Sequence, residues 1–460
     1  MAPRARLTVL ILATAALGLT SAASAKPNLL FILTDDQRAD TLSVMPATAA
    51  NFDVVFRKAI VTTPECCPSR TSILTGEYVH HHGVLNNQEH SSFTAREAES
   101  LGPWLQEQGY YTGFIGKYLN RYLVDEPVPP GWDEFRARVW NEDGTMIGNG
   151  YTSFSLREYW HKGPVTHDEI VAYPNASTPN AYSTRRFGSL AEQFIARAHD
   201  ADFNPGGKPW ALFVWTAAPH LPHIVEDDYT DARVPAWTPP PSFLEPDMRD
   251  KPREVRLSPL RRPSTYPFEA ERAGAMQLLM SVDDLVERVW QAVDGFGERG
   301  NTWGLFTSDN GYFWGEHRLT KKLHGYEESI RVPFRLAVPN QGAAKIGEAL
   351  AANIDIAPTF LELAGGSAQP GFDGHSLVGL AQGGVASCPC MRTLLIENWD
   401  TRRYSGVRTN RWKYIRWPSG REELYDLARD RFELQNLIHK RAQADRLDRL
   451  RAALDVLVES

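Results

Sequence analysis

Four continuous apolar segments, each followed by polar residues, constrain the fold of this chain most strongly. The segments are "NLLFILTDD" (28–36), "YYTGFIGK" (110–117), "WALFVWTAAPH" (210–220) and "TWGLFTSDNG" (302–311). Continuous apolar runs are typical of strands that are buried on both faces of a parallel sheet. Between them, residues 187–199 and the apolar repeat from Leu278 to Val289 have the spacing of amphipathic helices. We therefore predict an α/β fold with a large mixed, mostly parallel sheet sandwiched by helices.

The polar residues at the ends of these segments are the first candidates for a functional site. In sheets of this class, ligands bind at the carboxyl ends of the strands. Residues that are far apart in the sequence can therefore contribute to one site. The candidates are Asp35, Asp36, Lys117, His220, Asp309 and Asn310.

The pattern changes near the C-terminus. Residues 404–427 alternate like antiparallel strands with a turn at Thr409–Asn410, and residues 441–460 have the spacing of an amphipathic helix. We predict a small C-terminal subdomain of antiparallel sheet and helix at 392–460, following a main domain at 26–391. Residues 229–267 are rich in Pro, Arg and Asp, and we expect them to form a long surface excursion.

The first 25 residues have the features of a secretory signal peptide. Two arginines precede an apolar run at 7–19, and Ala23-Ser24-Ala25 suits a signal peptidase. We predict that residues 1–25 are removed and that the mature chain is secreted, to the extracellular space or the periplasm. The run is short and Ala-rich for a membrane anchor, and no later stretch is long and apolar enough to cross a bilayer.

Charge and cysteine content limit the classes of partner and site. The chain of 460 residues has a formal net charge of -7 and no basic stripe, so nothing indicates a nucleic-acid partner. The spacing of its four cysteines matches zinc knuckles poorly. Export would permit a disulfide, but Cys388 and Cys390 can pair with each other or with Cys67, and the sequence leaves this open.

The stretch "PECCPSRTSILTG" (64–76) carries the most specific chemistry. Pro68 fits the first position of a helix, and Thr75-Gly76 can end it. Cys66 then lies at a helix N-terminus, where the backbone favours an anion, and Arg70 adds a fork of donors one turn later. These features predict an activated sulfur beside an oxyanion pocket. Two buried cysteines that cap a helix are the structural alternative.

The same stretch resembles a family motif. "CCPSRTSILTG" is similar to the C-x-P-S-R-x-x-x-L-T-G pattern of type I sulfatases, in the alkaline-phosphatase-like superfamily. The resemblance implies that a formylglycine-generating enzyme oxidises Cys66 to formylglycine and that Cys67 fills the variable position. Other segments resemble further motifs of the family. They are "LTDDQRAD", "GFIGKYLN", "APHLPH", "TSDNGYFWGEHRL", "KKLHGYEESIRVPF" and "ELYDLARDRFELQNL". The forms "HHHGVLNN" and "GKYLN" look most like N-acetylglucosamine-6-sulfatases and the related extracellular heparan endosulfatases.

The resemblance implies one divalent cation. Its ligands would be Asp35, Asp36, Asp309 and Asn310, with the modified Cys66 completing the set. Three carboxylates and an amide oxygen are hard donors, which suit Ca²⁺ or Mg²⁺ better than zinc.

The resemblance also implies positive and donor groups around a bound sulfate. These are Arg70, Lys117, His220 and Lys322, with Lys321 as a neighbouring alternative to Lys322. Many sulfatases have G-K-W-H where this chain has "GKYLN", so the histidine that assists the formylglycine is missing at that position. His80, His81 or His82 are alternatives for this role, and His223 and His317 are candidates for supporting positions.

The implied function is hydrolysis of a sulfate ester. A hydroxyl of the hydrated aldehyde at position 66 attacks sulfur, Lys322 or His220 protonates the leaving oxygen, and the second hydroxyl ejects sulfate. We expect a sulfated carbohydrate, such as 6-sulfated N-acetylglucosamine in a glycosaminoglycan, or another small sulfate ester. The alternatives are an aryl sulfatase, a phosphate or phosphonate ester hydrolase on the same fold, and an inactive glycan-binding protein.

Overall fold

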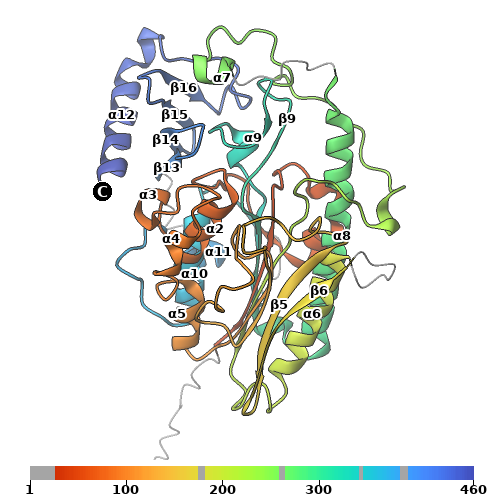
Figure 1. The fold of residues 1–460 in the computed structure, drawn as a ribbon. Helices are drawn as coiled ribbons and strands as arrows, with labels where there is room; N and C mark the ends of the chain where they lie inside the picture. Colours follow the sequence, from red (N-terminus) through yellow and green to blue (C-terminus); the bar gives the residue numbers. More distant parts are fainter. Residues whose placement is uncertain (1–25, 175–181, 258–264, 341–344, 384–391) are drawn as a thin grey trace, which may run out of the picture.

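A ten-stranded sheet forms the centre of the computed structural model, which describes residues 26–174, 182–257, 265–340, 345–383 and 392–460 (Figure 1). The four predicted strands are β1 (Asn28–Thr34), β3 (Tyr111–Gly116), β7 (Trp210–Trp215) and β8 (Thr302–Ser308). They lie side by side in the order β8-β1-β7-β3, and every pair is parallel. All their residues are buried, which explains the continuous apolar runs. The prediction of a mostly parallel sheet is confirmed.

Further strands, some parallel and some antiparallel to their neighbours, complete both sides of this sheet. The outer strands are β4 (Glu134–Arg138), β5 (Phe154–Lys162) and β6 (Val165–Tyr173) on one side, and β11 (Phe334–Ala337), β2 (Val54–Phe56) and β12 (Lys345–Gly347) on the other. β5 pairs antiparallel with β4 and β6, and β11 pairs antiparallel with β8 and β2. The sheet is therefore mixed at its edges, as predicted.

Helices cover both faces of the sheet. Leu29, Phe31 and Leu33 of β1 pack in one hydrophobic core, and Leu30 and Ile32 pack in the other. This alternation follows from the period of two in a strand. The first core includes residues of α2 (Cys66–Thr75), α5 (Leu101–Glu107), α10 (Ile356–Leu363) and α11 (Val378–Ala381). The second core includes residues of α6 (Ser183–Ala198) and α8 (Phe268–Gly295). Helix α1 (Pro46–Asn51) packs against α8. The two predicted helices are α6 and part of α8.

A small antiparallel sheet and a helix form the C-terminal region, as predicted. The strands are β13 (Thr393–Asn398), β14 (Tyr404–Thr409), β15 (Trp412–Arg416) and β16 (Glu422–Asp426), paired in sequence order. Leu447, Leu450 and Leu454 of α12 (Ala444–Glu459) pack in the core of this region. The boundary at residue 392 remains a prediction.

A buried charge cluster joins this region to the main sheet. Glu327, the first residue of α9 (Glu327–Ile330), forms ion pairs with Arg408 of β14 and with Lys413 of β15, each at 3.0 Å. Lys413 also lies 2.7 Å from Glu433, and all four side chains are at most a tenth exposed. Removing one member would leave a buried charge unpaired, which is costly. The cluster therefore holds the segment after Lys322 against the C-terminal sheet.

The remaining described elements are short. They are α3 (Val79–His82), α4 (Ser91–Thr94), α7 (Arg253–Arg256), β9 (Phe313–Trp314) and β10 (Thr320–Lys321), with 3-10 turns at Leu42–Val44, Asp227–Tyr229, Arg299–Asn301, Asn353–Asp355 and Arg441–Gln443. Within 229–267, the described residues contain little regular structure besides α7, consistent with an irregular excursion.

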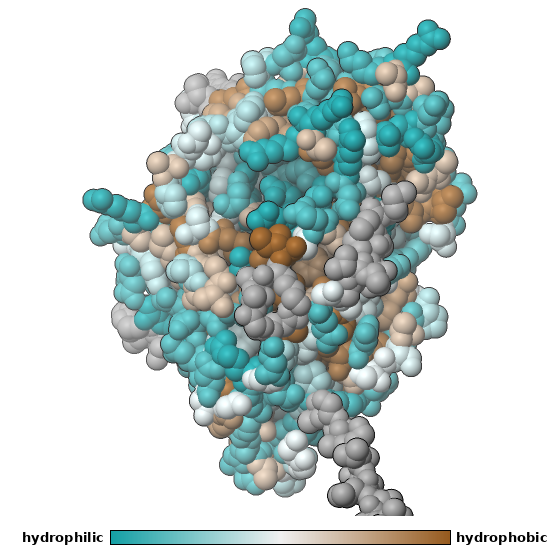
Figure 2. All heavy atoms as spheres, turned by 180° about the vertical axis from the view of Figure 1, so that it is seen from behind, coloured by the Kyte–Doolittle hydropathy of each residue, from teal (hydrophilic) through white to brown (hydrophobic). Residues whose placement is uncertain are grey.

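The molecular surface is mainly hydrophilic on the face that Figure 2 shows, with small apolar areas between the polar side chains. None of the helices in the described part of the chain combines the length and the apolarity that a membrane span requires. The predicted signal peptide lies outside the described residues, as do Cys388 and Cys390, whose pairing the sequence leaves open. Cys66 and Cys67 are both buried free cysteines.

Candidate functional site

Two acidic pairs meet at the carboxyl edge of the sheet because β1 and β8 are in register. Thr34 pairs with Ser308, so Asp35 and Asp36 leave the sheet beside Asp309 and Asn310. The Asp36 N–H donates to Asp309 Oδ1 at 3.1 Å, and the Asn310 amide donates to Asp36 Oδ1 at 2.6 Å. Asp36 has a φ of 67°, in the left-handed region that non-glycine residues rarely adopt. Strained backbone held by hydrogen bonds is frequent at functional sites.

Helix α2 brings Cys66 to the same edge. The helix begins at Cys66 and ends at Thr75-Gly76 as predicted, and Gly76 has a φ of 74°, in the left-handed region. Pro68 is the third helical residue, so its predicted place at the first position is wrong. The missing N–H of Pro68 is still harmless, because the first four helical N–H groups have no partner within the helix.

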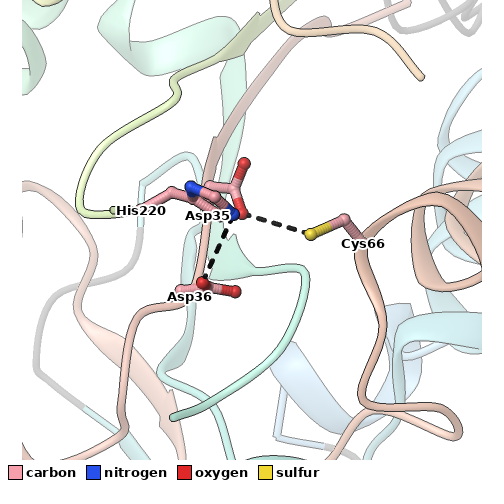
Figure 3. Close-up of side chains that lie close together, drawn as sticks. All are labelled: Asp35, Asp36, Cys66 and His220. Carbon is pink, nitrogen blue, oxygen red and sulfur yellow. Dashed lines mark hydrogen bonds and ion pairs between the residues drawn. The ribbon is translucent and has the colours of Figure 1, made fainter. Parts of the chain in front are cut away.

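The Cys66 thiol lies between charged groups. Its Sγ is 3.4 Å from Asp35 Oδ1 and 2.7 Å from Lys322 Nζ. Figure 3 shows Asp35, Asp36, Cys66 and His220 pointing toward one another. Burial and the negative charge of Asp35 raise the pKa of the Cys66 thiol. Burial therefore opposes the activated thiolate that the helix N-terminus was expected to favour at Cys66.

Arg70 and Lys117 form ion pairs with the carboxylates at the site: Arg70 with Asp35 and Asp309, and Lys117 with Asp35. Arg70, one turn along α2, is fully buried, and its Nε donates to Asp309 Oδ2 at 2.8 Å. Its Nη2 lies 3.3 Å from Asp35 Oδ2, and Nη1 donates to the Lys117 carbonyl. Lys117, directly after β3, pairs with Asp35 through Nζ. The two cations therefore fix the orientation of the carboxylates.

Lys322 and His220 lie on the more open side. Lys322 Nζ pairs with Asp36 Oδ1 and lies 3.5 Å from Asn310 Oδ1. Lys321 is exposed on β10, so of the two neighbouring lysines Lys322 is the one at the site. His220 Nε2 lies 3.7 Å from Asp36 Oδ2, and its side chain is 39% exposed. The structure thus brings all nine predicted site residues into one connected cluster.

The fixed charges of the cluster cancel, but they do not act equally on every carboxylate. Three carboxylates face three permanent cations, Arg70, Lys117 and Lys322. Burial alone would raise the pKa of Asp35, but Lys117, His220 and Arg70 hold it well below its usual range. Burial and the negative charge of Asp35 raise the pKa of Asp309. The repulsion between the buried carboxylates of Asp35 and Asp309 therefore acts on Asp309, and an additional positive charge would reduce it.

The carboxylate and amide oxygens of the cluster suit a hard divalent cation, whereas the Cys66 thiol and the His220 imidazole are softer donors. Asp35, Asp36, Cys66 and His220 each offer one ligand atom, and these atoms lie within 4.8 Å of one another. The ammonium group of Lys322 contacts Asp36, Cys66 and Asn310, so three of the five predicted ligands converge on one positive charge. Carboxylate and amide oxygens are the donors that Ca²⁺ and Mg²⁺ prefer.

The alternative histidines have other partners. His80 bonds to Glu397, His81 bonds to Asp373 at 2.7 Å, and His82 lies 3.1 Å from Ser72 Oγ. Burial lowers the pKa of His82 to about 3.

Two further histidines were candidates for supporting positions. His317 is buried against Glu245, with Nδ1 2.7 Å from its carboxylate. His223 lines a small gap together with Asp36, so it lies nearest to the site. Burial and the neighbouring His220 lower the pKa of His223 to about 4.

Sequence reasoning missed several supporting residues. The Tyr151 hydroxyl donates to the carbonyls of His220 and Ala217, the latter at 3.1 Å, and so positions the loop after β7. Asn87 Oδ1 accepts the Cys67 N–H at 2.8 Å, at the first turn of α2. Tyr151 lies outside the quoted segments, and Asn87 ends the segment "HHHGVLNN" (80–87), in which only the histidines were given a possible role.

Glu97 provides a prediction about pH and stability. Burial raises its pKa from 4.5 to about 7, and its carboxyl group accepts a 3.4 Å hydrogen bond from Tyr118, next to Lys117. Between these pH values the folded state binds more protons than the unfolded state, so stability falls as pH rises. We expect Glu97→Gln to raise the free energy of unfolding by about 3 kcal/mol at pH 8 and to leave it nearly unchanged near pH 4. Urea unfolding of both proteins at the two pH values measures this, and an equal difference at both would contradict it.

Two protein-family models together match nearly all of the described chain. Residues 27–367 match the family model "Sulfatase", and residues 315–460 match "N-sulphoglucosamine sulphohydrolase, C-terminal". The chain is 33% identical over 375 residues to the extracellular sulfatase SULF-1 homolog of Drosophila melanogaster, covering 78% of this chain and 32% of that protein. It is 29% identical over 384 residues to the N-acetylglucosamine-6-sulfatase of Homo sapiens, covering 79% and 66%. It thus spans only about a third of the fly relative.

Solved structures with low sequence identity share the fold. One, solved in complex with its substrate D-glucosamine-2-N,6-O-disulfate, has a TM-score of 0.71 at 21% identity, over 94% of this chain and 97% of that chain. The phosphonate monoester hydrolase of Agrobacterium radiobacter has a TM-score of 0.67 at 22% identity, over 93% and 96%. The fold alone therefore does not separate the two activities.

Proposed function

The chain belongs to the sulfatase family of hydrolases, and we propose that it removes sulfate from a sulfated sugar, with 6-sulfated N-acetylglucosamine as the preferred unit. The observation that carries this proposal is the convergence of Cys66 of the family motif with three carboxylates and four donor groups at one edge of the sheet. Relatives that are named N-acetylglucosamine-6-sulfatases support the choice of sugar.

Two groups that the family implies fit the residues present. Asp35, Asp36, Asp309, Asn310 and residue 66 would hold Ca²⁺, or Mg²⁺ in its place. The cation would supply Lewis acidity and would relieve the repulsion between Asp35 and Asp309. Oxidation of Cys66 to formylglycine would supply, in the hydrated aldehyde, one hydroxyl for attack on sulfur and a second for release of sulfate.

The residues of the chain bind and orient the sulfate. A divalent cation and a monoanionic sulfate ester add charges of opposite sign to a cluster whose fixed charges already cancel. Lys117 and Lys322 place their ammonium groups beside Asp35 and Asp36, where they also reach a bound anion. Arg70 is completely buried behind Asp309, so it acts by holding that carboxylate in place.

Lys322 and His220 are the candidates for protonating the leaving oxygen. Both lie next to Asp36, and His220 is the more exposed of the two. Asp36 and the other carboxylates raise the pKa of Lys322 well above its usual value, although burial alone would lower it. The raised pKa favours a charged Lys322, which suits a residue that stabilises negative charge on the sulfate.

Replacing Lys322 tests its assignment against its neighbour. We expect Lys322→Ala to lower kcat/KM for an aryl sulfate by about 10²- to 10³-fold, because Asp36 and the bound sulfate lose a buried ammonium. Lys321→Ala is the matched control, and we expect a change below about two-fold because Lys321 is exposed. Initial rates of the two variants measure this. Equal losses would contradict the assignment of Lys322.

Substrate competition tests the proposed reaction. We expect faster turnover of an aryl sulfate than of the matching aryl phosphate or phenyl phosphonate, and release of sulfate from N-acetylglucosamine 6-sulfate in preference to 2- or 4-sulfated sugars. A preference for the phosphonate would support the alternative hydrolase on this fold. Binding without turnover of any ester would support an inactive glycan-binding protein.

Export and maturation complete the proposal. We propose that residues 1–25 direct secretion, that residues 26–391 form the catalytic domain and residues 392–460 its C-terminal subdomain, and that a formylglycine-generating enzyme reads the motif at Cys66. Relatives named extracellular sulfatases support this location.

A further inference from the structure

A second cleft lies beside the proposed catalytic centre. Its volume is about 830 Å³, within the range of sites that hold small ligands. It opens between the loop after β1, the segment 237–241, the start of α8, and the C-terminal region at α9, β14 and the residues after β16. None of the nine predicted site residues lines it. Arg38, Thr41 and Trp314 line both this cleft and the small gap at Asp36, so the two sites are neighbours.

The lining of the cleft is strongly basic. The basic residues are Arg38, Arg57, Lys58, Arg272, Arg331, Arg408 and Arg431, and the acidic residues are Asp40, Glu327 and Glu328. Because these residues come from separate segments, the sequence shows no basic stretch. The fold alone collects them, and such a concentration of one sign of charge in a cleft attracts anions.

Three of the arginines are poorly neutralised. Among the described residues Arg431 has no ion pair, and its guanidinium lies 4.4 Å from the ring centre of Phe432. Arg57 is exposed and 4.0 Å from Glu348, which also pairs with Lys58 at 3.3 Å. Arg331 is 3.9 Å from Glu327, a carboxylate that Arg408 and Lys413 already neutralise at 3.0 Å. These guanidinium groups are therefore available to an anionic ligand.

A fourth arginine is buried, and among the described residues its ion-pair partner is a largely exposed carboxylate. Arg272 is 5% exposed, and its nearest carboxylate, Glu269, lies 3.5 Å away on a side chain that is 63% exposed. One of its nitrogens donates to the Pro235 carbonyl at 2.8 Å. Burial and the neighbouring Arg38 lower the pKa of Arg272. A buried cation in this state gains stability from a bound anion.

Aromatic rings accompany the charges. The Arg272 guanidinium lies 6.0 Å from the ring centre of Trp237, which is partly exposed at the cleft, and Phe432 is partly exposed on the opposite wall. An aromatic face packs well against the apolar C–H face of a pyranose ring. Guanidinium groups bind sulfate and carboxylate through paired donors. Aromatic rings beside such groups therefore suit an anionic sugar chain.

We propose that this cleft binds a segment of a sulfated saccharide chain, at a site separate from the centre that removes sulfate. The choice of a sulfated saccharide among anions rests on the proposed function and on the aromatic rings. A chain held in the cleft keeps further sulfated units close to the catalytic centre, which raises their effective concentration.

Binding of a heparin-derived hexasaccharide to the full chain carrying Cys66→Ala tests the proposal without turnover. We expect the added substitutions R57Q, R331Q and R431Q to weaken binding at least about ten-fold. The control carries K440Q, R441Q and R449Q, which remove the same three charges from exposed positions outside the cleft. We expect it to bind within about two-fold of the parent. Equal affinities of the two triple variants, or no binding by the parent, would overturn the proposal.

Trp237 separates a saccharide site from a general anion site. We expect Trp237→Ala to weaken hexasaccharide binding about ten-fold and to leave binding of inorganic polyphosphate unchanged, while Trp237→Phe retains both. Unchanged hexasaccharide affinity in Trp237→Ala would overturn the saccharide assignment. In proteins with Cys66 intact, the R57Q, R331Q and R431Q variant should hydrolyse a small aryl sulfate at the parent rate. An inactive parent that still binds through the cleft would contradict the proposed function and leave this inference standing.

Discussion

Replacing Cys66 by alanine is expected to reduce kcat/KM for an aryl sulfate by at least about 10⁴-fold. Its side chain lies 3.4 Å from Asp35 Oδ1 and 2.7 Å from Lys322 Nζ, where the predicted cation and sulfate meet. Alanine cannot be oxidised to an aldehyde, so no hydroxyl remains to attack sulfur. The small cavity costs about 1 to 2 kcal/mol of stability, so the variant should fold. Initial rates and thermal unfolding measure the two effects separately.

The neighbouring cysteine provides the control. Cys67 packs in the apolar core between α2 and the sheet, and its backbone N–H donates to Asn87, a bond that alanine retains. We expect Cys67→Ala to keep kcat/KM within about three-fold of the parent value. Similar losses in the two variants would show that the doublet has a structural role, and substantial activity in Cys66→Ala would contradict the proposed mechanism.

Removal of the divalent cation is expected to have the second-largest effect. Dialysis against a chelator should lower the rate by at least about 10²-fold, and added Ca²⁺ or Mg²⁺ should restore it. Without the cation, the pKa of Asp309 stays raised by burial and by the charge of Asp35. Asp36→Asn should lower kcat/KM by about 10²- to 10³-fold and raise the concentration of cation required, because one ligand loses its charge. Titration of activity against free Ca²⁺ measures both.

A matched substitution close by provides the control. Asp40 is four residues from Asp36, is half exposed and pairs with Arg38 at 2.8 Å. We expect Asp40→Asn to leave the dependence on cation unchanged for an aryl sulfate. Full activity after exhaustive chelation, or equal effects of the two substitutions, would contradict the assignment of the metal ligands.

The central part of the fold was predictable because burial on both faces leaves a clear mark in the sequence. Strands β1, β3, β7 and β8 are mostly apolar and buried along their whole length. The helices between them indicate that they pair in parallel. The edge strand β6 is mostly exposed, and β2 and β12 have three residues each. Such segments lack both continuous apolarity and a long alternating pattern, so the sequence does not reveal them.

The site was predictable where residues follow strand ends or belong to motifs of the family. Asp35 and Asp309 meet because β1 and β8 are in register, which the rule for parallel sheets anticipates. Tyr151 and Asn87 act through hydrogen bonds to backbone groups of distant segments, so only the tertiary structure shows their role. The same holds for the basic cleft, whose charges come from segments between Arg38 and Arg431.

The chemical state of residue 66 tests the central claim most directly. Trypsin should release it within the peptide 59–70. The protein is purified in active form from the native host, and mass spectrometry of this peptide then identifies the side chain at position 66 from its mass. We predict that sulfur has been replaced by an aldehyde oxygen, which a hydrazine reagent would label. A fully active preparation in which this peptide carries only an intact Cys66 thiol would contradict the account.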